Sequence, residues 1–67
     1  MTLQKLFTMR LKQLRKVRVM AQAVLAQKTK LSLGHVARLE QGRHDPPLNT
    51  LTKLAKALKV AAAELVK

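Results

Sequence analysis

One helix-terminating segment, at residues 42–47, limits how the chain can fold. Gly42 precedes the run Asp45-Pro46-Pro47, and no helix continues through such a run, because proline lacks an N–H and restricts the residue before it. Glycine is also the residue most often found just past the C-terminal end of a helix. We therefore expect one helix to end near Gln41 and another to begin after Pro47.

Apolar residues recur at helical spacing before that break. A first helix is predicted from Thr2, a possible N-terminal cap, to about Val17. Its apolar stripe consists of Leu3, Phe7, Leu11 and Leu14, with Leu6 and Val17 on the flank. Good helix formers from Gln22 to Lys28 predict a second helix that ends near Thr29-Lys30-Leu31. Ser32 can then cap a third helix, from Leu33 to Gln41.

Beyond the break, a fourth amphipathic helix and a short fifth are predicted. The fourth carries its apolar residues at Leu48, Leu51, Leu54, Ala55 and Leu58, and the fifth spans Ala61 to Val66. No strand pattern, internal repeat or low-complexity linker interrupts this order. The predicted fold class is therefore all-α, as one compact five-helix domain over residues 1–67.

Size and charge narrow the functional classes. A chain of 67 residues without cysteine has room for one core, and a second subunit is its natural source of extra stability. Two histidines cannot close a metal site alone, so we expect no metal and no cofactor. A net charge of +11, from 14 Lys and Arg against three acids, favours a nucleic acid as partner. The sequence has no apolar run long enough to span a membrane and no signal-peptide order at its N-terminus, so a cytoplasmic location is expected.

The order of residues resembles the Cro/C1-type (XRE-like) helix-turn-helix family of phage and bacterial repressors. The resemblance rests on Leu11-Lys12-Gln13-Leu14-Arg15, Gln22 to Ala26, Ser32, Val36, Arg38-Leu39-Glu40-Gln41-Gly42-Arg43, Pro46, Leu51 to Leu58 and Glu64-Leu65. It implies a lambda-repressor-like DNA-binding domain with its helix-turn-helix at about residues 22–41. It also implies a bacterial or phage-encoded, nucleoid-associated transcriptional regulator, most simply a repressor that binds double-stranded DNA.

The resemblance also assigns scaffold roles to individual residues. It places Ala26 at the crossing of the second and third helices and Val36 in the core, and it pairs Arg15 with Glu40. The chain departs from the family at positions that usually hold glycine, namely Val19, Lys30 and Lys59, and Ala21 replaces the usual hydroxyl cap of the second helix. A non-glycine residue at positive φ costs about 1 kcal/mol. Either the turn at Lys30 is remodelled, or that cost is accepted because Lys30 gains a phosphate contact.

Base reading is expected from the exposed first turns of the third helix. The candidate residues are Ser32, Leu33, Gly34, His35 and Arg38. Arg38 can bind guanine O6 and N7 together, Leu33 can touch a thymine methyl, and Gly34 allows close backbone approach. His35 is either a donor to the DNA or an ordinary exposed histidine. Leu33 is equally open to a core role.

Phosphate contacts are expected on both sides of that helix. The candidates are Gln22, Lys28, Lys30, Arg43 and His44, together with the N-terminus of the second helix. Because one module of this size reads few base pairs, we expect a homodimer on an inverted repeat. Residues 58–66 either form that dimer contact or only close the monomer core.

Three rival functions fit the sequence less well. An enzyme is disfavoured because the acids Glu40, Asp45 and Glu64 and the two histidines form no evident acid-base set, and no small-molecule substrate is indicated. A cationic membrane-surface peptide is disfavoured by the break after Gly42 and by the helices that follow it. A regulatory protein-interaction module of the antitoxin type uses the same fold to hold a partner protein, and it stays the main alternative.

Overall fold

The computed structural model describes residues 3–43 and 45–66. It contains the helices α1 (Leu3–Val17), α2 (Gln22–Thr29), α3 (Leu33–Glu40) and α4 (Leu48–Leu58), followed by a short 3-10 helix, η1 (Ala62–Leu65). No residue in these ranges lies in a strand. The all-α prediction is confirmed, and the predicted bounds of the first four helices agree to within one residue at every end that is described. Thr2 lies outside the described residues, so its role as a cap is not described.

The fifth element differs from the prediction. Residues 62–65 form a 3-10 helix rather than an α-helix, which makes the domain one of four α-helices and a final 3-10 turn. Only a few residues separate the end of α4 from this element, and short connecting segments commonly adopt 3-10 geometry. Leu65 is fully buried, so the short turn still serves to close the core.

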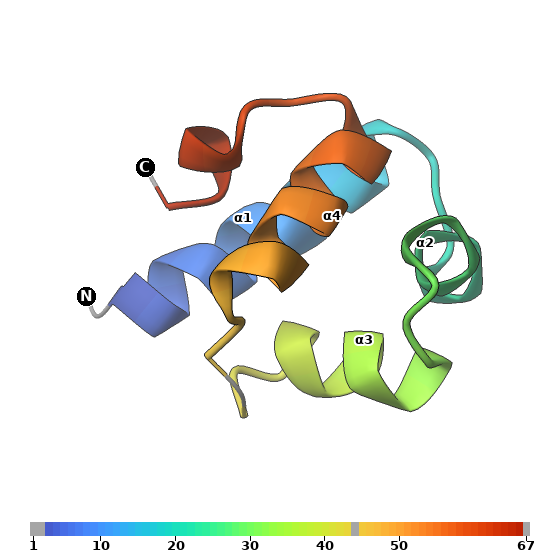
Figure 1. Ribbon diagram of the computed structural model, residues 1–67, viewed down its shortest axis with the longest axis horizontal. Coiled ribbons are helices and arrows are strands. Elements are labelled where there is room, and N and C mark those ends of the chain that lie inside the picture. Colours follow the sequence, from blue (N-terminus) through green and yellow to red (C-terminus); the bar gives the residue numbers. More distant parts are fainter. Residues whose placement is uncertain (1–2, 44, 67) are drawn as a thin grey trace.

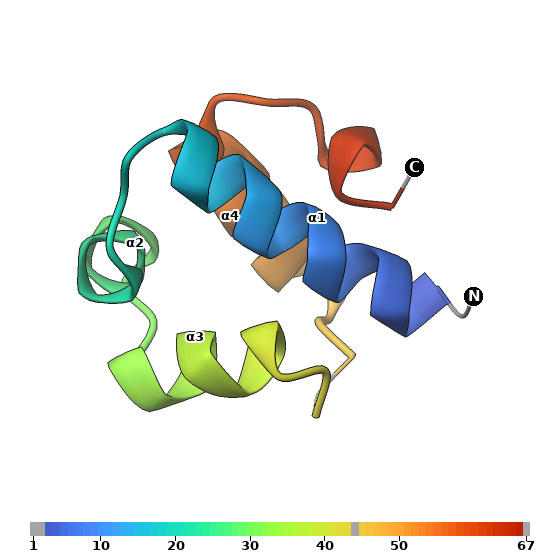
Figure 2. The same ribbon diagram turned by 180° about the vertical axis from the view of Figure 1, so that it is seen from behind.

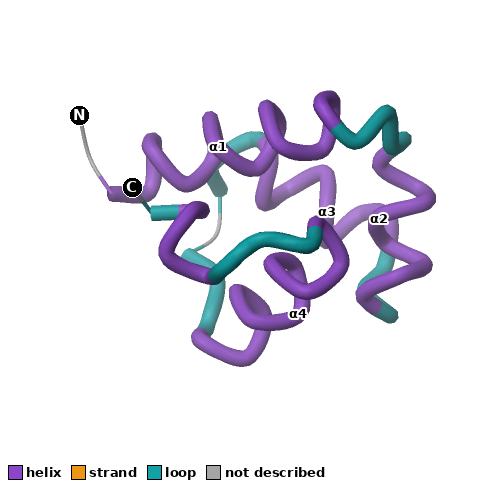
Figure 3. The backbone as a smooth tube through the Cα atoms, turned by 90° about the horizontal axis from the view of Figure 1, so that it is seen from above, coloured by secondary structure: helices purple, strands orange, loops and turns teal. Residues whose placement is uncertain are grey.

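The helices enclose one core. α3 lies along one edge of the molecule, with α2 seen end-on beside its first turn (Figure 1). The reverse view shows α1 in front and α3 again along the lower edge (Figure 2). η1 packs against both α1 and α4 (Figure 3). The buried apolar residues come from every element: Phe7, Leu11, Leu25, Ala26, Val36, Leu39, Leu54, Ala55, Leu58 and Leu65.

The predicted apolar stripes of α1 and α4 are buried over part of their length, but three of their residues at helix ends are exposed. Phe7 and Leu11 are buried in α1, whereas Leu3 is 66% exposed and Val17 is exposed as well. Leu48, at the start of α4, is 76% exposed. Leu3 and Leu48 thus belong to the predicted stripes but not to the core.

All four α-helices end in the same backbone motif. Each is followed by a residue at positive φ: Val19 (53°), Lys30 (61°), Gly42 (74°) and Lys59 (58°). The next residue donates its N–H to a carbonyl five positions back, in the pairs Met20–Arg15, Leu31–Ala26, Arg43–Arg38 and Val60–Ala55. This is the Schellman motif, which satisfies carbonyls at the helix end. The turn at Lys30 is therefore not remodelled, and it holds a lysine where glycine is favoured.

The burial of the residue that follows each positive-φ position explains which of these positions holds glycine. Met20, Leu31 and Val60 follow the three non-glycine positions, and each packs against the core. The burial of these side chains stabilises the motif and offsets the cost of the left-handed residue, which is about 1 kcal/mol. Arg43 follows Gly42 and is exposed, so it offers no such burial. Glycine is therefore found at the end of α3, the one α-helix whose positive-φ residue is not followed by a side chain packed on the core.

Candidate nucleic-acid interface

The first turns of α3 form an exposed surface on a helix whose other side is buried. Val36 and Leu39 have no exposed area, and they hold the inner side of α3 on the core. Ser32 begins the helix, because its Oγ accepts a hydrogen bond of 3.0 Å from the backbone N–H of His35. Leu33 is 51% exposed, so its side chain is available at the surface rather than placed in the core.

The residues predicted to read bases lie together on these turns. Ser32, Leu33, Gly34 and Arg38 are exposed, and His35 is half-buried. A Cβ on Gly34 would lie 3.4 Å from Nη1 of Arg38, so the guanidinium extends back over Gly34 toward the start of the helix. Long helical side chains tend to lean in this direction. The only fork-shaped donor among these residues is therefore placed over the first turn of α3.

The far end of α3 is fixed by a buried polar cluster. Nε and Nη2 of Arg15 donate to the two carboxylate oxygens of Glu40 at 2.6 and 3.0 Å. A third guanidinium nitrogen of Arg15 donates to the carbonyl of Met20 at 2.8 Å. Glu40 is buried, and two parallel hydrogen bonds of this kind fix geometry as well as energy. The Arg15–Glu40 pair thus joins α1, the loop after it and the end of α3.

Gln22 belongs to the same cluster. Its side-chain amide nitrogen donates to Oε1 of Glu40 at 3.0 Å, which uses one of the two amide protons and ties the first turn of α2 to α3. Ala21 before it supplies no side-chain cap, so the first backbone N–H groups of α2 have no side-chain acceptor there. These N–H groups are the kind that bind an anion at a helix N-terminus.

The predicted phosphate-binding residues do not lie together. Gln22 is at the start of α2, and Lys28 is at its other end, about 10 Å away at 1.5 Å per residue. Arg43 is exposed after α3, and His44 lies outside the described residues. The set is therefore divided between the two ends of α2 and the segment after α3.

Lys28 and Lys30 lie beside three lysines that sequence reasoning missed. They line a hollow of about 420 Å³ together with Lys53, Lys56 and Lys59, and we call these five residues the lysine hollow. The last three are spaced at intervals of three along the end of α4. That spacing was visible in the sequence as a stripe on one side of a helix. Its approach to the end of α2 depends on the packing of the two helices.

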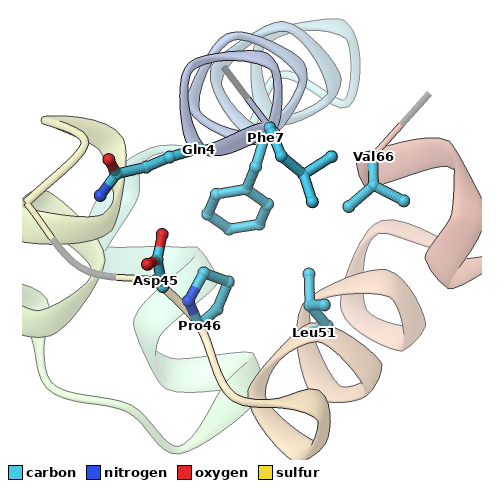
Figure 4. Close-up of a pocket in the computed structure, with 7 residues that line it drawn as sticks. Gln4, Phe7, Asp45, Pro46, Leu51 and Val66 are labelled. Atoms are coloured by element: carbon cyan, nitrogen blue, oxygen red, sulfur yellow. The ribbon is translucent and has the colours of Figure 1, made fainter.

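A second hollow is mainly apolar and lies at the opposite end of α4. Its volume is about 390 Å³, and the described residues that line it include no lysine or arginine: Leu3, Gln4, Phe7, Asp45, Pro46, Leu51 and Val66. Figure 4 shows the Phe7 ring directed into this groove, with Asp45 and Pro46 to one side. Among residues 3–43 and 45–66, Asp45 is the only charged group in the lining, so these residues form no acid-base pair in the groove.

Other kinds of site are not seen in the described part of the chain. Residues 3–43 and 45–66 bring no three His, Cys, Asp or Glu side chains together as metal ligands. In the same residues, no helix is both long enough and apolar enough to cross a membrane. Leu58 and Leu65 are fully buried, so within residues 58–66 these two side chains close the monomer core.

Comparison with known proteins points to one family. A family model described as a helix-turn-helix domain matches residues 6–66. The immunity repressor protein of Bacillus phage phi105 is 39% identical over 57 residues, which cover 85% of this chain and 40% of the phage protein. The chain thus matches well under half the length of that relative.

Solved structures agree with this assignment. The restriction-modification controller protein C.AhdI from Aeromonas hydrophila superposes with a TM-score of 0.86 at 33% identity, over 90% of this chain and 91% of that one. An HTH_3 family transcriptional regulator from Vibrio cholerae gives a TM-score of 0.87 at 29% identity, over 92% of this chain and 35% of the other. These relatives are regulators of transcription or of restriction-modification rather than enzymes.

Proposed function

Because the chain belongs to the Cro/C1-type helix-turn-helix family of DNA-binding regulators, we propose that it binds a specific double-stranded DNA operator through the first turns of α3. The observation that carries this proposal is the contrast within α3 itself. One side is held in the core by Val36 and Leu39, and the other presents Arg38 over Gly34 at the surface. An α-helix presented in this way fits the major groove.

Each residue of the first turns has a defined task in this proposal. Arg38 binds guanine O6 and N7 with two nitrogens of its guanidinium, a contact worth about 1 to 3 kcal/mol of discrimination. Leu33 contacts a thymine methyl group, and Gly34 lets the backbone approach the base pairs. Ser32 can donate its hydroxyl proton while its oxygen caps α3, and His35 donates to a base or to a phosphate.

Phosphate contacts set the position of α3 in the groove. The first N–H groups of α2 and the remaining amide proton of Gln22 bind one strand, and Arg43 and His44 bind beside the end of α3. Lys28 and Lys30 add contacts near the helix-turn-helix turn. These contacts carry no sequence information, and they make affinity depend strongly on salt.

We further propose that two copies bind an inverted repeat and act as a repressor. The longest extent of one copy is 29 Å, which is less than the 34 to 36 Å that separates half-sites on one side of the duplex. One copy therefore covers no more than one half-site. The phage immunity repressor among the relatives supports repression, and with it a bacterial or phage-encoded protein that acts in the cytoplasm. The whole of residues 1–67 then serves as one DNA-binding unit.

A second candidate function is to hold a partner protein, as antitoxin-type regulators do. The apolar groove of Figure 4 supports it, because exposed Leu3 lines this groove without any basic side chain. In that case the partner buries the exposed side chain of Leu3.

Selection of DNA from a random pool with the purified protein tests the first proposal against the second. Recovered sequences are compared at low salt and again at raised salt, where non-specific binding is weaker. Enrichment of an inverted repeat at both salt concentrations supports an operator-binding dimer. Recovery of sequences without any common motif contradicts specific operator binding and leaves the partner-binding candidate.

A further inference from the structure

The lysine hollow gathers positive charge that the fold does not neutralise. Five lysines from α2, α4 and their caps line one depression, and all five are exposed. The three acidic residues of the chain lie elsewhere: Glu40 is bonded to Arg15, Asp45 lines the apolar groove, and Glu64 is in η1. A hollow lined by one sign of charge focuses its field and attracts the opposite charge.

The helix ends beside the hollow account for only part of this charge. α2 and α4 both end there, and each C-terminus carries roughly half a negative charge, which favours nearby lysines. Two such ends neutralise about one of the five positive charges. An excess of about four therefore faces solvent, which is more than helix capping requires.

Two of these lysines also occupy strained backbone. Lys30 and Lys59 have φ of 61° and 58°, where glycine is the favoured residue. Glycine at either position would remove both the strain and the charge. The burial of Leu31 and Val60 offsets that strain in the fold, but it gives no reason for a charged residue rather than glycine at these two positions.

The hollow begins close to the surface that reads DNA. Lys30 is three residues before Leu33, so their Cα atoms are at most about 11 Å apart. Figure 1 shows α2 with the end of α4 on one side of it and the first turn of α3 on the other. A duplex bound by α3 thus passes near Lys28 and Lys30. The lysines of α4 continue the same basic surface beyond α2, on the side away from α3.

We propose that the lysine hollow binds the sugar-phosphate backbone of the same duplex, beyond the base pairs that α3 reads. This inference rests on the proposed function, because it takes operator DNA as the ligand. Each phosphate neutralised by a lysine releases condensed counterions. The hollow therefore adds affinity and salt dependence without adding sequence preference, and it makes DNA that flanks the operator part of the binding site.

The test compares two duplexes and two matched variants. One duplex contains only the selected operator, and the other extends it by about one helical turn of 10 base pairs at each end. Lys53→Gln/Lys56→Gln removes two charges from the hollow. Lys12→Gln/Lys16→Gln removes two exposed charges from α1 and serves as the control. Circular dichroism checks that both variants fold, and Lys59→Gly provides a further variant that removes a charge together with its backbone strain.

The wild-type protein is expected to bind the extended duplex about tenfold more tightly at low salt. Lys53→Gln/Lys56→Gln abolishes most of that gain but changes binding to the short duplex by no more than about twofold. Its plot of log affinity against log salt on the extended duplex becomes shallower by about 4 for the dimer, because four contacts are lost at 0.9 per phosphate contact. The α1 control keeps both the gain and the slope. Lys59→Gly weakens binding to the extended duplex while raising the melting temperature.

Three results overturn this inference. The first is that the wild-type protein binds the extended duplex no more tightly than the short one. The second is that both double variants lose affinity for the extended duplex equally, and the third is that the hollow binds a second duplex instead of the flanking DNA. Failure of the proposed function looks different, because the wild-type protein then binds operator and scrambled duplexes alike. In that case the salt slopes of the two double variants on the scrambled duplex still test whether the lysine hollow binds phosphates. A slope that differs between them supports the hollow, and equal slopes exclude it.

Discussion

The two ends of α3 are built in opposite ways. At the C-terminal end, Glu40 is buried and its carboxylate accepts hydrogen bonds from Arg15 and Gln22. At the N-terminal end, Leu33 and Gly34 are exposed, Ser32 caps the helix, and the guanidinium of Arg38 extends back over Gly34 from the last turn. The buried end fixes the helix to the scaffold, and the exposed end presents the guanidinium of Arg38 at the surface. Variants at the two ends should therefore affect different properties.

The largest effect on stability is expected at the buried end. Glu40→Ala leaves the Arg15 guanidinium largely buried and without its carboxylate, which costs about 3 to 5 kcal/mol in such pairs. Urea denaturation measures the change in the free energy of unfolding. Gln41→Ala, at the exposed neighbouring position, is the control and should stay within about 0.5 kcal/mol. A loss below 1 kcal/mol for Glu40→Ala would show that the cluster does not anchor α3.

A smaller effect is expected at the cap of α3. Ser32→Ala removes the acceptor for the His35 N–H and lowers the free energy of unfolding by about 1 kcal/mol. The reverse change, Ala21→Ser, supplies a hydroxyl to α2 at a position that now has no side-chain cap. It should raise the free energy of unfolding by a similar amount. Equal denaturation midpoints for the two variants would contradict this account of the caps.

The smallest effect on stability is expected at Gly34, and it has the opposite sign. A Cβ there makes ordinary contact with Arg38 at 3.4 Å, and alanine is favoured over glycine in a helix by about 0.5 to 1 kcal/mol. Gly34→Ala should therefore stabilise the fold slightly while weakening operator binding, because it keeps the helix backbone from the base pairs. Denaturation and DNA titration of the same preparation measure both. Tighter binding would show that close approach at Gly34 is not used.

Much of the fold follows from local sequence signals. The start of α4 and the end of α3 follow from Gly42, Pro46 and Pro47, because these residues act on their own backbone. The conformation of Lys30, by contrast, was left open between a remodelled and a strained turn. The structure shows the strained turn, and the burial of Leu31 after it gives the reason.

The site was less predictable than the fold. Periodicity could not decide whether Leu33 enters the core or stays exposed, because that depends on which elements cover the start of α3. The exposure of Leu3 and Leu48 depends on the same kind of information. The lysine hollow depends on the packing of α4 against the end of α2. The sequence therefore predicted Lys28 and Lys30 as candidates, but not the lysines of α4 and its cap.

The central claim is that the exposed end of α3 reads bases while the basic residues around it bind phosphates. Equilibrium binding to the selected operator and to every single-base variant of it, for the wild-type protein, Arg38→Ala and Lys28→Ala, tests this division directly. Arg38→Ala should lose discrimination of about 1 to 3 kcal/mol at one base position in each half-site. Lys28→Ala should weaken binding to all sequences alike and lower the salt slope by about 2 for the dimer, about 1 for each copy. If both variants weaken binding uniformly, Arg38 does not read a base, and the assignment of the reading surface is wrong.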